Sequence, residues 1–348
     1  KLFDLDGSNE LELDLPAVGS VWTGLVGRQG ENEAFYNLSG FADPGSIYRV
    51  DLATGESTLF KRPELDYNPD DIVTRQVFFT SADGTLVPMF VAHRRDLPLD
   101  GSRPALMYGY GTFAWAASPW FQPHVAAWLN MGGVYALPNL RGGGEYGEEW
   151  HQAGILRNRQ NSIDDYVAAA EALVENGLTS ADRLVAYGQS AGGPVVAAAA
   201  IQRRSLFAAV VLEYPVLDMV RYDRFTGGIR WQSEFGSTED ADDFRALLDY
   251  SPYHNLEKGA CYPATMILPG SRDEVTVPMH AYKFAAALQY AQGCGRPALL
   301  RVSWGAGHST GATLDDSIDN WTDQIAFISR VLGDKGIKFS DVARRTSN

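Results

Sequence analysis

The stretch Gly188-Gln189-Ser190-Ala191-Gly192-Gly193 decides the fold of this chain. It follows an apolar run at 184–187 and precedes residues 195–200, a run typical of a helix. A G-x-S-x-G sequence between a strand and a helix makes a strained turn, in which the positions two before and two after the serine must be small. Such a turn projects the Ser190 hydroxyl above the sheet, and the N–H of Ala191 points where an oxyanion would form. The stretch therefore predicts a nucleophilic serine, with a glycine-rich turn capped by serine as the alternative.

Strand and helix patterns alternate on both sides of this turn, from about residue 71 to the end of the chain. Strands that are apolar without alternation predict a parallel sheet whose two faces are both covered by helices. We therefore expect residues 71–348 to form an α/β-hydrolase catalytic domain. The expected strands are 75–79, 86–92, 105–108, 134–137, 184–187, 208–212, 264–268 and 298–302, and the expected helices are 123–131, 163–175, 195–200, 279–290 and 317–332.

The first 70 residues have a different texture, with short strands broken by turns. Residues 46–52 alternate, 53–56 form a turn and 57–60 resume the strand, which is the rhythm of propeller blades. Since a blade needs about 40–45 residues and a propeller at least about four blades, the segment supplies only about one and a half. We expect residues 1–70 to be the C-terminal part of a β-propeller, with an independent small β-module as the alternative. The polar, proline-punctuated stretch 63–71 is the expected boundary.

Composition excludes several classes of partner. Of the 348 residues, 45% are hydrophobic and 21% charged, as in an ordinary globular protein, and the formal net charge is −14. This charge, with no Lys/Arg-rich run, argues against nucleic acid and anionic membranes as partners. Cys261 and Cys294 are the only cysteines, so we expect no disulfide framework and no cysteine metal site. We also expect no cofactor. No stretch is long enough to span a bilayer. Because the chain opens with Lys rather than Met, we expect it to be part of a longer protein, and the cellular compartment stays open.

A serine nucleophile needs a histidine base and a carboxylate that fixes the tautomer of the histidine. In α/β-hydrolases these follow along the chain in the order serine, acid, histidine. Three histidines follow Ser190, namely His254, His280 and His308. His308 ends the flexible loop GAGH just past an expected strand, whereas His254 lies in a polar turn and His280 opens a helix. We expect His308 to be the base.

The expected acid is Asp273, which comes shortly after the strand 264–268. The carboxyl ends of strands are where this kind of sheet places its chemistry. The adjacent Glu274 and the earlier Asp218 are the alternatives.

The second oxyanion donor should come from the loop after an early strand. That loop is YGYGTF (108–113), which contains two glycines and two phenols. A buried tyrosine hydroxyl needs a partner, and a developing oxyanion would supply one.

With these pieces placed, the chain resembles the prolyl oligopeptidase family of serine peptidases over its full length. Residues 141–147 read alone could pass for a phosphate-binding loop, but no strand-to-helix G-x-G-x-x-G or Lys-Ser/Thr follows them. The matching blocks are YGYGTF (108–113), NLRGGGEYGEEWHQAGIL (139–156), GQSAGG (188–193), YSPYHNL (250–256) and GAGH (305–308).

The resemblance implies catalytic roles, position by position. Ser190 would be the nucleophile, Asp273 the acid and His308 the base. Tyr110 would be the side-chain oxyanion donor, with the N–H of Ala191 as the other.

The resemblance also implies a pocket for a proline ring at P1, the residue before the cleaved bond. Trp231 falls where prolyl-specific members place a tryptophan against that ring, and Phe113, Val216 and Phe235 fall at the other walls. A flat aromatic surface suits proline, which is compact and apolar. An ordinary core aromatic is the alternative for Trp231.

Two positions depart from the prolyl pattern. Val275 stands two residues after the expected acid, where prolyl members commonly carry an arginine that holds the substrate backbone. Ala191 follows the nucleophile, where those members usually have asparagine and the oligopeptidase B branch has alanine. That branch needs an acidic pocket, yet Trp231 occupies a position where an acid would be expected.

The sequence therefore predicts a serine peptidase that hydrolyses short peptides after proline, through an acyl-enzyme on Ser190. The first alternative is an oligopeptidase or esterase of the same fold with a different P1 preference. The second is a non-enzymatic binding module, against which the intact set of catalytic candidates argues. Besides the short peptide, we expect as partner the remaining N-terminal and propeller part of the same protein, as an earlier segment or as a separate chain.

Overall fold

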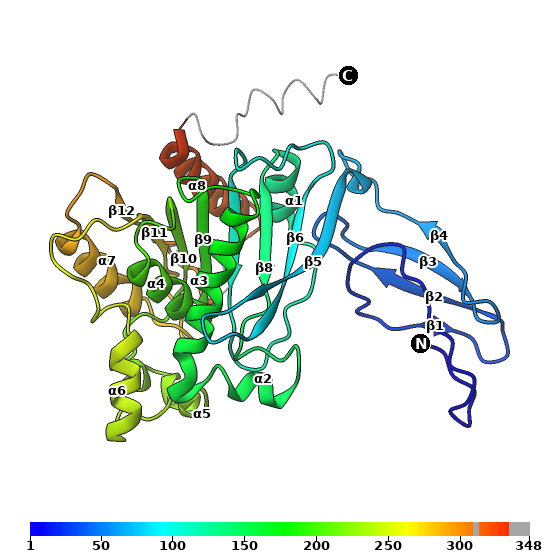
Figure 1. The fold of residues 1–348 in the computed structure, drawn as a ribbon, viewed down its shortest axis with the longest axis horizontal. Coiled ribbons are helices and arrows are strands. Elements are labelled where there is room, and N and C mark those ends of the chain that lie inside the picture. The colour runs from blue at the N-terminus through cyan, green and yellow to red at the C-terminus, as the bar shows by residue number, and fades with distance from the viewer. Residues whose placement is uncertain (309–312, 334–348) are drawn as a thin grey trace.

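The computed structural model describes residues 1–308 and 313–333. Two sheets organise these residues and lie next to each other along the long axis of the molecule (Figure 1). The first is a four-stranded antiparallel sheet near the N-terminus, and the second is an eight-stranded, mostly parallel sheet.

The smaller sheet has the strand order β1-β2-β3-β4. Its middle strands alternate between buried and more exposed residues, as the sequence predicted for β3. One face therefore carries a small apolar cluster, made by Ala34, Tyr36, Leu38, Tyr48 and Val50. The strands are β1 (Val26–Gly27), β2 (Glu33–Leu38), β3 (Ser46–Asp51) and β4 (Ser57–Lys61).

The larger sheet has the order β12-β11-β10-β9-β7-β8-β6-β5. Strands β5 and β6 form the predicted hairpin, β6 pairs antiparallel with β8, and the remaining neighbours pair in parallel. The strands are β5 (Ile72–Thr80), β6 (Leu86–Arg94), β7 (Ala105–Gly109), β8 (Val134–Pro138), β9 (Leu184–Gln189), β10 (Ala209–Glu213), β11 (Ala264–Leu268) and β12 (Ala298–Leu300).

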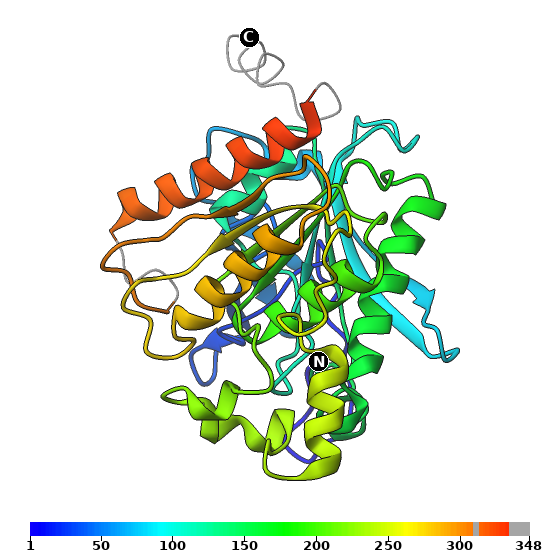
Figure 2. The ribbon, with the colours of Figure 1, turned by 90° about the vertical axis from the view of Figure 1, so that its left-hand side faces the viewer.

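Helices cover both faces of the larger sheet (Figure 2). The strands of this sheet are apolar without alternation because both faces are buried. In β7, for example, Leu106 packs into the apolar cluster on one face and Met107 into the cluster on the other. Helices α1 (Pro123–Asn130) and α8 (Leu314–Leu332) lie on the first face, and α3 (Arg159–Glu175), α4 (Gly193–Gln202) and α7 (Met279–Ala291) lie on the second.

Three short helices were not predicted from the sequence. Helices α2 (Glu148–Gln152), α5 (Gln232–Phe235) and α6 (Ala241–Tyr250) lie at one end of the larger sheet (Figure 1). Helix α6 does carry a local signal, because the Asp240 side chain caps it by accepting from the N–H groups of Asp242 and Asp243. Helices α2 and α5 are single turns without a side-chain cap, so their sequence offers no such signal.

The two sheets contact each other through side chains and loops. The Phe41 ring packs edge-on against Tyr135 of β8, with ring centroids 5.0 Å apart. The Ser20 hydroxyl donates to the carbonyl of Pro119 at 2.7 Å. Between the sheets, the connector 63–71 is held by Arg62, whose guanidinium pairs with Asp70 at 2.8 Å.

The two cysteines, from which the sequence predicted no disulfide framework, form a single disulfide. The Cys261–Cys294 bridge joins the loop before β11 to the loop before β12. The bridge therefore lies at the amino ends of β11 and β12, whereas Asp273 and His308 follow the carboxyl ends of these two strands. Among the helices in residues 1–308 and 313–333, none combines the length and apolarity that crossing a membrane requires.

Candidate active site

Ser190 stands immediately after β9, at the turn into α4. Its φ of 50° lies in the left-handed region, which residues other than glycine rarely occupy. Gly192 allows the end of β7 to approach this turn, because a Cβ at Gly192 would lie 2.3 Å from the Gly109 carbonyl oxygen and 2.8 Å from the Tyr110 Cα. The turn thus has the strained backbone and the small residue that a nucleophile elbow requires.

Asp273 and His308 form a direct hydrogen bond, with 2.9 Å between Oδ2 and Nδ1. The other carboxylate oxygen accepts from the backbone N–H groups of Val275 and Thr276, each at 2.9 Å. The Asp273 side chain is fully buried, whereas His308 keeps 20% of its side chain exposed. With its Nδ1 proton directed at the carboxylate, His308 presents Nε2 as an acceptor.

The alternative acids lie in different surroundings. Glu274 is exposed. Asp218 is buried, but its carboxylate pairs with Lys283. Asp273 is therefore the carboxylate of the three that contacts His308.

The alternative histidines also have other partners. His254 Nδ1 lies 2.8 Å from the Ser251 hydroxyl. His280 is 1% exposed, and its Nδ1 accepts from the Asp218 N–H at 3.1 Å. Burial lowers the pKa of His280 to about 4, so its ring is neutral at physiological pH.

The segment 214–216, directly after β10, contacts both Ser190 and His308, and no sequence motif pointed to its first residue, Tyr214. Its ring packs against the His308 ring, with centroids 4.6 Å apart. Two residues later, the Val216 N–H donates to the Ser190 carbonyl at 3.1 Å. One short segment therefore touches both the elbow and the histidine loop.

Thr276 also contacts the predicted acid and base, although its position was not predicted from the sequence. Its buried hydroxyl lies 2.9 Å from Asp273 Oδ2, 2.6 Å from the Tyr214 carbonyl oxygen and 3.2 Å from His308 Nδ1. The pattern Asp-x-x-Thr, in which the aspartate accepts from the N–H three residues on, is a local signal that could have drawn attention to it.

Tyr110 follows β7 and lies against the elbow at Gly192. Burial, aided by the carboxylate of Glu234, raises the pKa of its hydroxyl above the usual value. The phenol is therefore protonated at physiological pH and able to donate. Its ring also contacts Trp115 edge-on, with centroids 5.2 Å apart.

The four expected pocket residues divide into a cluster and a supporting residue. Phe113 and Trp231 both meet Phe235 edge-on, with ring centroids 5.9 and 6.4 Å apart, respectively. Phe113 is 41% exposed, while Phe235 is 1% exposed and anchors the cluster in the core. Val216 is fully buried beside the Ser190 turn.

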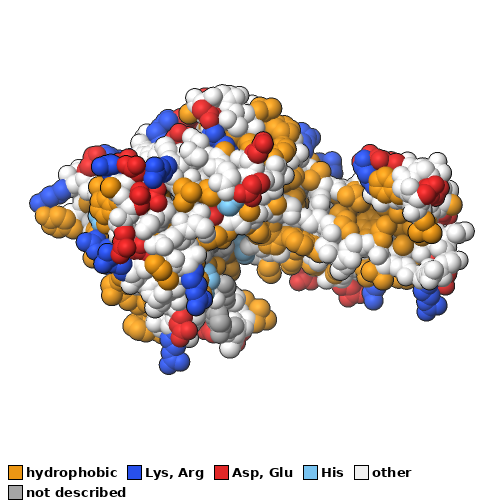
Figure 3. Space-filling view, turned by 90° about the horizontal axis from the view of Figure 1, so that it is seen from below, with side chains coloured by type: hydrophobic (Ala, Val, Ile, Leu, Met, Phe, Trp, Pro, Cys, Tyr) orange, Lys and Arg blue, Asp and Glu red, His pale blue; other side chains and the backbone are white. Residues whose placement is uncertain are grey.

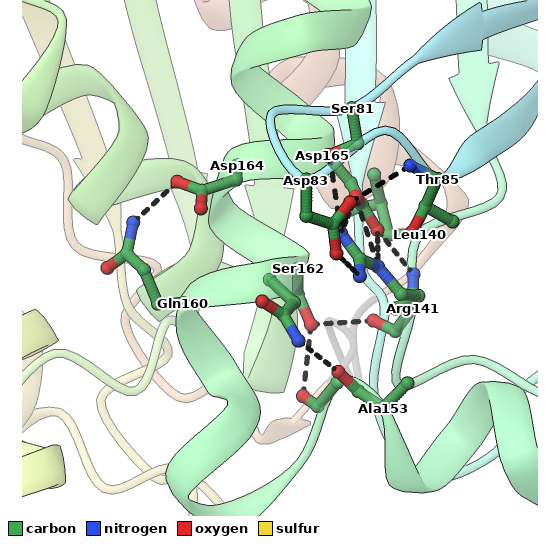
Figure 4. Close-up of polar contacts among 12 residues, drawn as sticks. Ser81, Asp83, Thr85, Leu140, Arg141, Ala153, Gln160, Ser162, Asp164 and Asp165 are labelled. Atoms are coloured by element: carbon green, nitrogen blue, oxygen red, sulfur yellow. Dashed lines mark hydrogen bonds and ion pairs between the residues drawn. The ribbon is translucent and has the colours of Figure 1, made fainter.

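The glycine-rich block that begins at Asn139 packs against the loop after β7, which carries Tyr110 and Phe113. Arg141 donates to the buried Asp165 through Nη2 at 2.6 Å, and it also pairs with Asp83 in the β5–β6 turn (Figure 4). The hydrogen bond from Arg141 lowers the pKa of Asp83 to about 2. Gly142 packs so closely on the loop after β7 that a Cβ would lie 2.3 Å from the Gly111 carbonyl oxygen. Within residues 1–308 and 313–333, no group of His, Cys, Asp and Glu is arranged to hold a metal ion.

Comparison with known proteins agrees with this architecture. The sequence profile of the prolyl oligopeptidase family matches residues 119–335, and that of its N-terminal β-propeller domain matches residues 1–63. The chain belongs to the prolyl oligopeptidase family. The predicted fold class, an α/β-hydrolase domain preceded by propeller strands, is thereby confirmed.

Individual relatives cover nearly the whole chain. It is 38% identical over 339 residues to the prolyl endopeptidase of Elizabethkingia miricola, which is 97% of this chain and 48% of that protein. It is 37% identical over 320 residues to a dual function macrocyclase-peptidase of Galerina marginata, covering 89% of this chain and 43% of the relative. The chain spans about half the length of the curated relatives it matches.

Solved structures give the same picture. A structure from a study of two prolyl endopeptidases superposes with a TM-score of 0.86 at 43% identity, covering 94% of this chain and 48% of that chain. Prolyl oligopeptidase B from Galerina marginata, bound to a 35mer substrate, superposes with a TM-score of 0.87 at 33% identity. That match covers 95% of this chain and 47% of the other.

Proposed function

We propose that the chain forms the catalytic part of a serine peptidase that hydrolyses short peptides on the carboxyl side of proline. The observation that carries the proposal is the 2.9 Å bond between His308 and the buried Asp273, next to a segment that also contacts the left-handed Ser190. Membership of a family with relatives named prolyl endopeptidase supports it.

In the proposed reaction, Ser190 Oγ bonds to the peptide carbonyl carbon while its proton passes to His308 Nε2. Asp273 stabilises the resulting imidazolium and keeps the ring oriented. Collapse of the tetrahedral intermediate breaks the C–N bond, and His308 donates its proton to the departing amine. A water molecule then attacks the ester carbon and gives its proton to His308. The second tetrahedral intermediate collapses by breaking the bond between the acyl carbon and Ser190 Oγ, which releases the carboxylic acid product while Oγ takes the proton back from His308.

The proposed oxyanion donors are the Tyr110 hydroxyl and the Ala191 N–H. Tyr110 is protonated, partly buried and packed against the elbow, as a preorganised donor should be. Ala191 is 3% exposed and directly follows the nucleophile in the turn.

Preference for proline is proposed to come from the aromatic cluster. Phe113 and Trp231 each meet the Phe235 ring edge-on, at interplanar angles of 79° and 80°, respectively. A proline side chain, which has no polar atoms, fits such a lining.

A different P1 preference, or esterase activity, is the second candidate. Val275 is 44% exposed beside Asp273, so the position offers an apolar surface and no charge to hold a substrate backbone. The test is a panel of matched chromogenic peptides with Pro, Ala, Arg or Phe at P1. We expect the highest kcat/KM for proline, and a higher value for any other residue would contradict the proposal.

We also propose that residues 1–70 belong to a propeller completed by another part of the protein, and that residues 71–348 are the catalytic domain. The smaller sheet carries exposed apolar side chains, which gather on the smaller lobe in Figure 3. Large exposed apolar patches mark surfaces that another element covers. The completed propeller would cover the Ser190 face and restrict substrates to short peptides.

A further inference from the structure

One buried carboxylate joins the loop that carries Tyr110 to the aromatic cluster. Glu234 is 3% exposed and lies on α5, between Trp231 and Phe235 in the sequence. We propose that Glu234 is a positioning residue that sets the preference for proline, by holding the loop 110–113 against the Trp231–Phe235 wall. This inference rests on the function proposed above.

Both oxygens of Glu234 accept hydrogen bonds from other elements. Oε1 accepts from the Thr112 hydroxyl at 2.6 Å and from the Phe113 N–H at 2.9 Å. The same oxygen accepts from Arg159 Nη2 of α3 at 2.9 Å. Oε2 lies 2.9 Å from His151 Nε2 of α2, so both carboxylate oxygens have a hydrogen-bond partner.

Arg159 extends this network to both parts of the pocket. Its guanidinium is 1% exposed, donates to the Gly111 carbonyl at 2.7 Å and lies over the Phe235 ring at 5.2 Å from the centroid. Burial alone would raise the pKa of Glu234, but the charge of Arg159 and the bonds from Thr112 and Phe113 hold it below its usual value. The carboxylate is therefore ionised, and its removal would leave a buried guanidinium without its partner.

The backbone of the loop needs such an anchor. Phe113 and Ala114 have φ values of 56° and 51°, so two consecutive residues with side chains are left-handed. A conformation of this kind persists only when its surroundings hold it. The bond from the Phe113 N–H to Glu234 fixes the first of these residues and keeps its ring in contact with Phe235.

This arrangement has a specific consequence for selectivity. If Glu234 only stabilised the fold, its substitution would lower activity equally for every substrate. If it positions the Phe113 side of the pocket, its substitution will affect a proline P1, which fills the pocket, more than an alanine P1, which does not. The ratio of the two kcat/KM values separates these cases.

The decisive variant is Glu234→Gln in the full-length protein, assayed with matched peptide p-nitroanilides carrying Pro or Ala at P1. We expect the Pro/Ala ratio of kcat/KM to fall by about tenfold, the scale of one lost apolar pocket contact. The matched control is Asp242→Asn on the neighbouring α6, whose carboxylate is exposed and pairs with Arg157 and Arg245. The control should leave the ratio unchanged.

Thr112→Val is the second variant, in case Glu234→Gln does not fold by circular dichroism. It removes one donor to Glu234 with little change in shape, so the ratio should fall in the same direction and by less. If Glu234→Gln folds and its Pro/Ala ratio of kcat/KM is unchanged, the inference is overturned. If only Thr112→Val folds, an unchanged ratio in that variant overturns it. Failure of the proposed function would be seen separately, because the parent protein itself would then show no preference for proline.

Discussion

The two sheets differ in how completely their residues are buried. Every residue of β7, β8, β10 and β11 is buried, since helices cover both faces of the larger sheet. In the smaller sheet, the edge strand β4 leaves Leu59 and Phe60 50% and 62% exposed, and β1 leaves Val26 60% exposed. The larger sheet can thus hold loops rigidly at its carboxyl ends, whereas the smaller sheet has apolar surface to offer to another element.

The proposed catalytic residues thus belong to the larger sheet, and the smaller sheet is proposed to bind the part of the protein that covers them. The candidate residues Ser190, Asp273 and His308 all follow strands of the larger sheet. Substitutions there should change the reaction itself, and substitutions in the smaller sheet should change assembly and leave the reaction with short substrates intact.

The largest effect is expected for Ser190→Ala. Removing the nucleophile should lower kcat by about 10⁶-fold, the loss known for a serine protease, with an unchanged melting temperature. The matched control is Ser57→Ala in β4 of the smaller sheet, which should retain full activity with short peptides. A Ser190→Ala protein that keeps a tenth of the parent activity would exclude Ser190 as nucleophile.

Tyr110→Phe should have the next largest effect. Loss of one oxyanion donor lowers kcat by about 10²–10³-fold, while KM stays nearly the same because the ground-state substrate is bound elsewhere. Steady-state kinetics with the proline substrate checks this. An unchanged kcat with a raised KM would make Tyr110 a binding residue instead.

Trp231→Ala should act on selectivity. The barrier for a proline P1 should rise by about 1–3 kcal/mol, the scale of a lost apolar contact in a specificity pocket. An alanine P1 should lose less, because it does not fill the pocket. Equal losses for the two substrates would show that Trp231 supports the fold and does not contact the P1 side chain.

The features that the sequence predicted are those with local signals. The strand 264–268 was predicted at its observed bounds, because a strand buried on both faces is a short apolar run between turn residues. Asp273 and His308 could be singled out because each follows such a run in the order that an α/β-hydrolase requires.

The features that the sequence did not reveal depend on distant partners. Glu234 binds Thr112 and Arg159, which lie 122 and 75 residues away in the chain. Nothing near Glu234 in the sequence shows that these residues meet it. The short helices α2 and α5 are likewise held by their surroundings, because they are single turns without a cap.

The smallest effect on activity is expected for Phe60→Ser in β4. In the full-length protein, another part of the propeller should cover this side chain, so the substitution should lower the free energy of unfolding by about 1–2 kcal/mol. The kcat for short peptides should not change. Denaturant unfolding gives the first value, and equal stability of variant and parent would show that Phe60 stays exposed.

The central claim is that Ser190 is the nucleophile, activated by His308 and Asp273. The most direct measurement is labelling of the purified protein with a fluorophosphonate probe, followed by mass spectrometry of its peptides. The account predicts one adduct, on Ser190, and labelling that is lost when His308 is replaced by alanine. A protein that is not labelled, or that is labelled at another residue, would contradict the account.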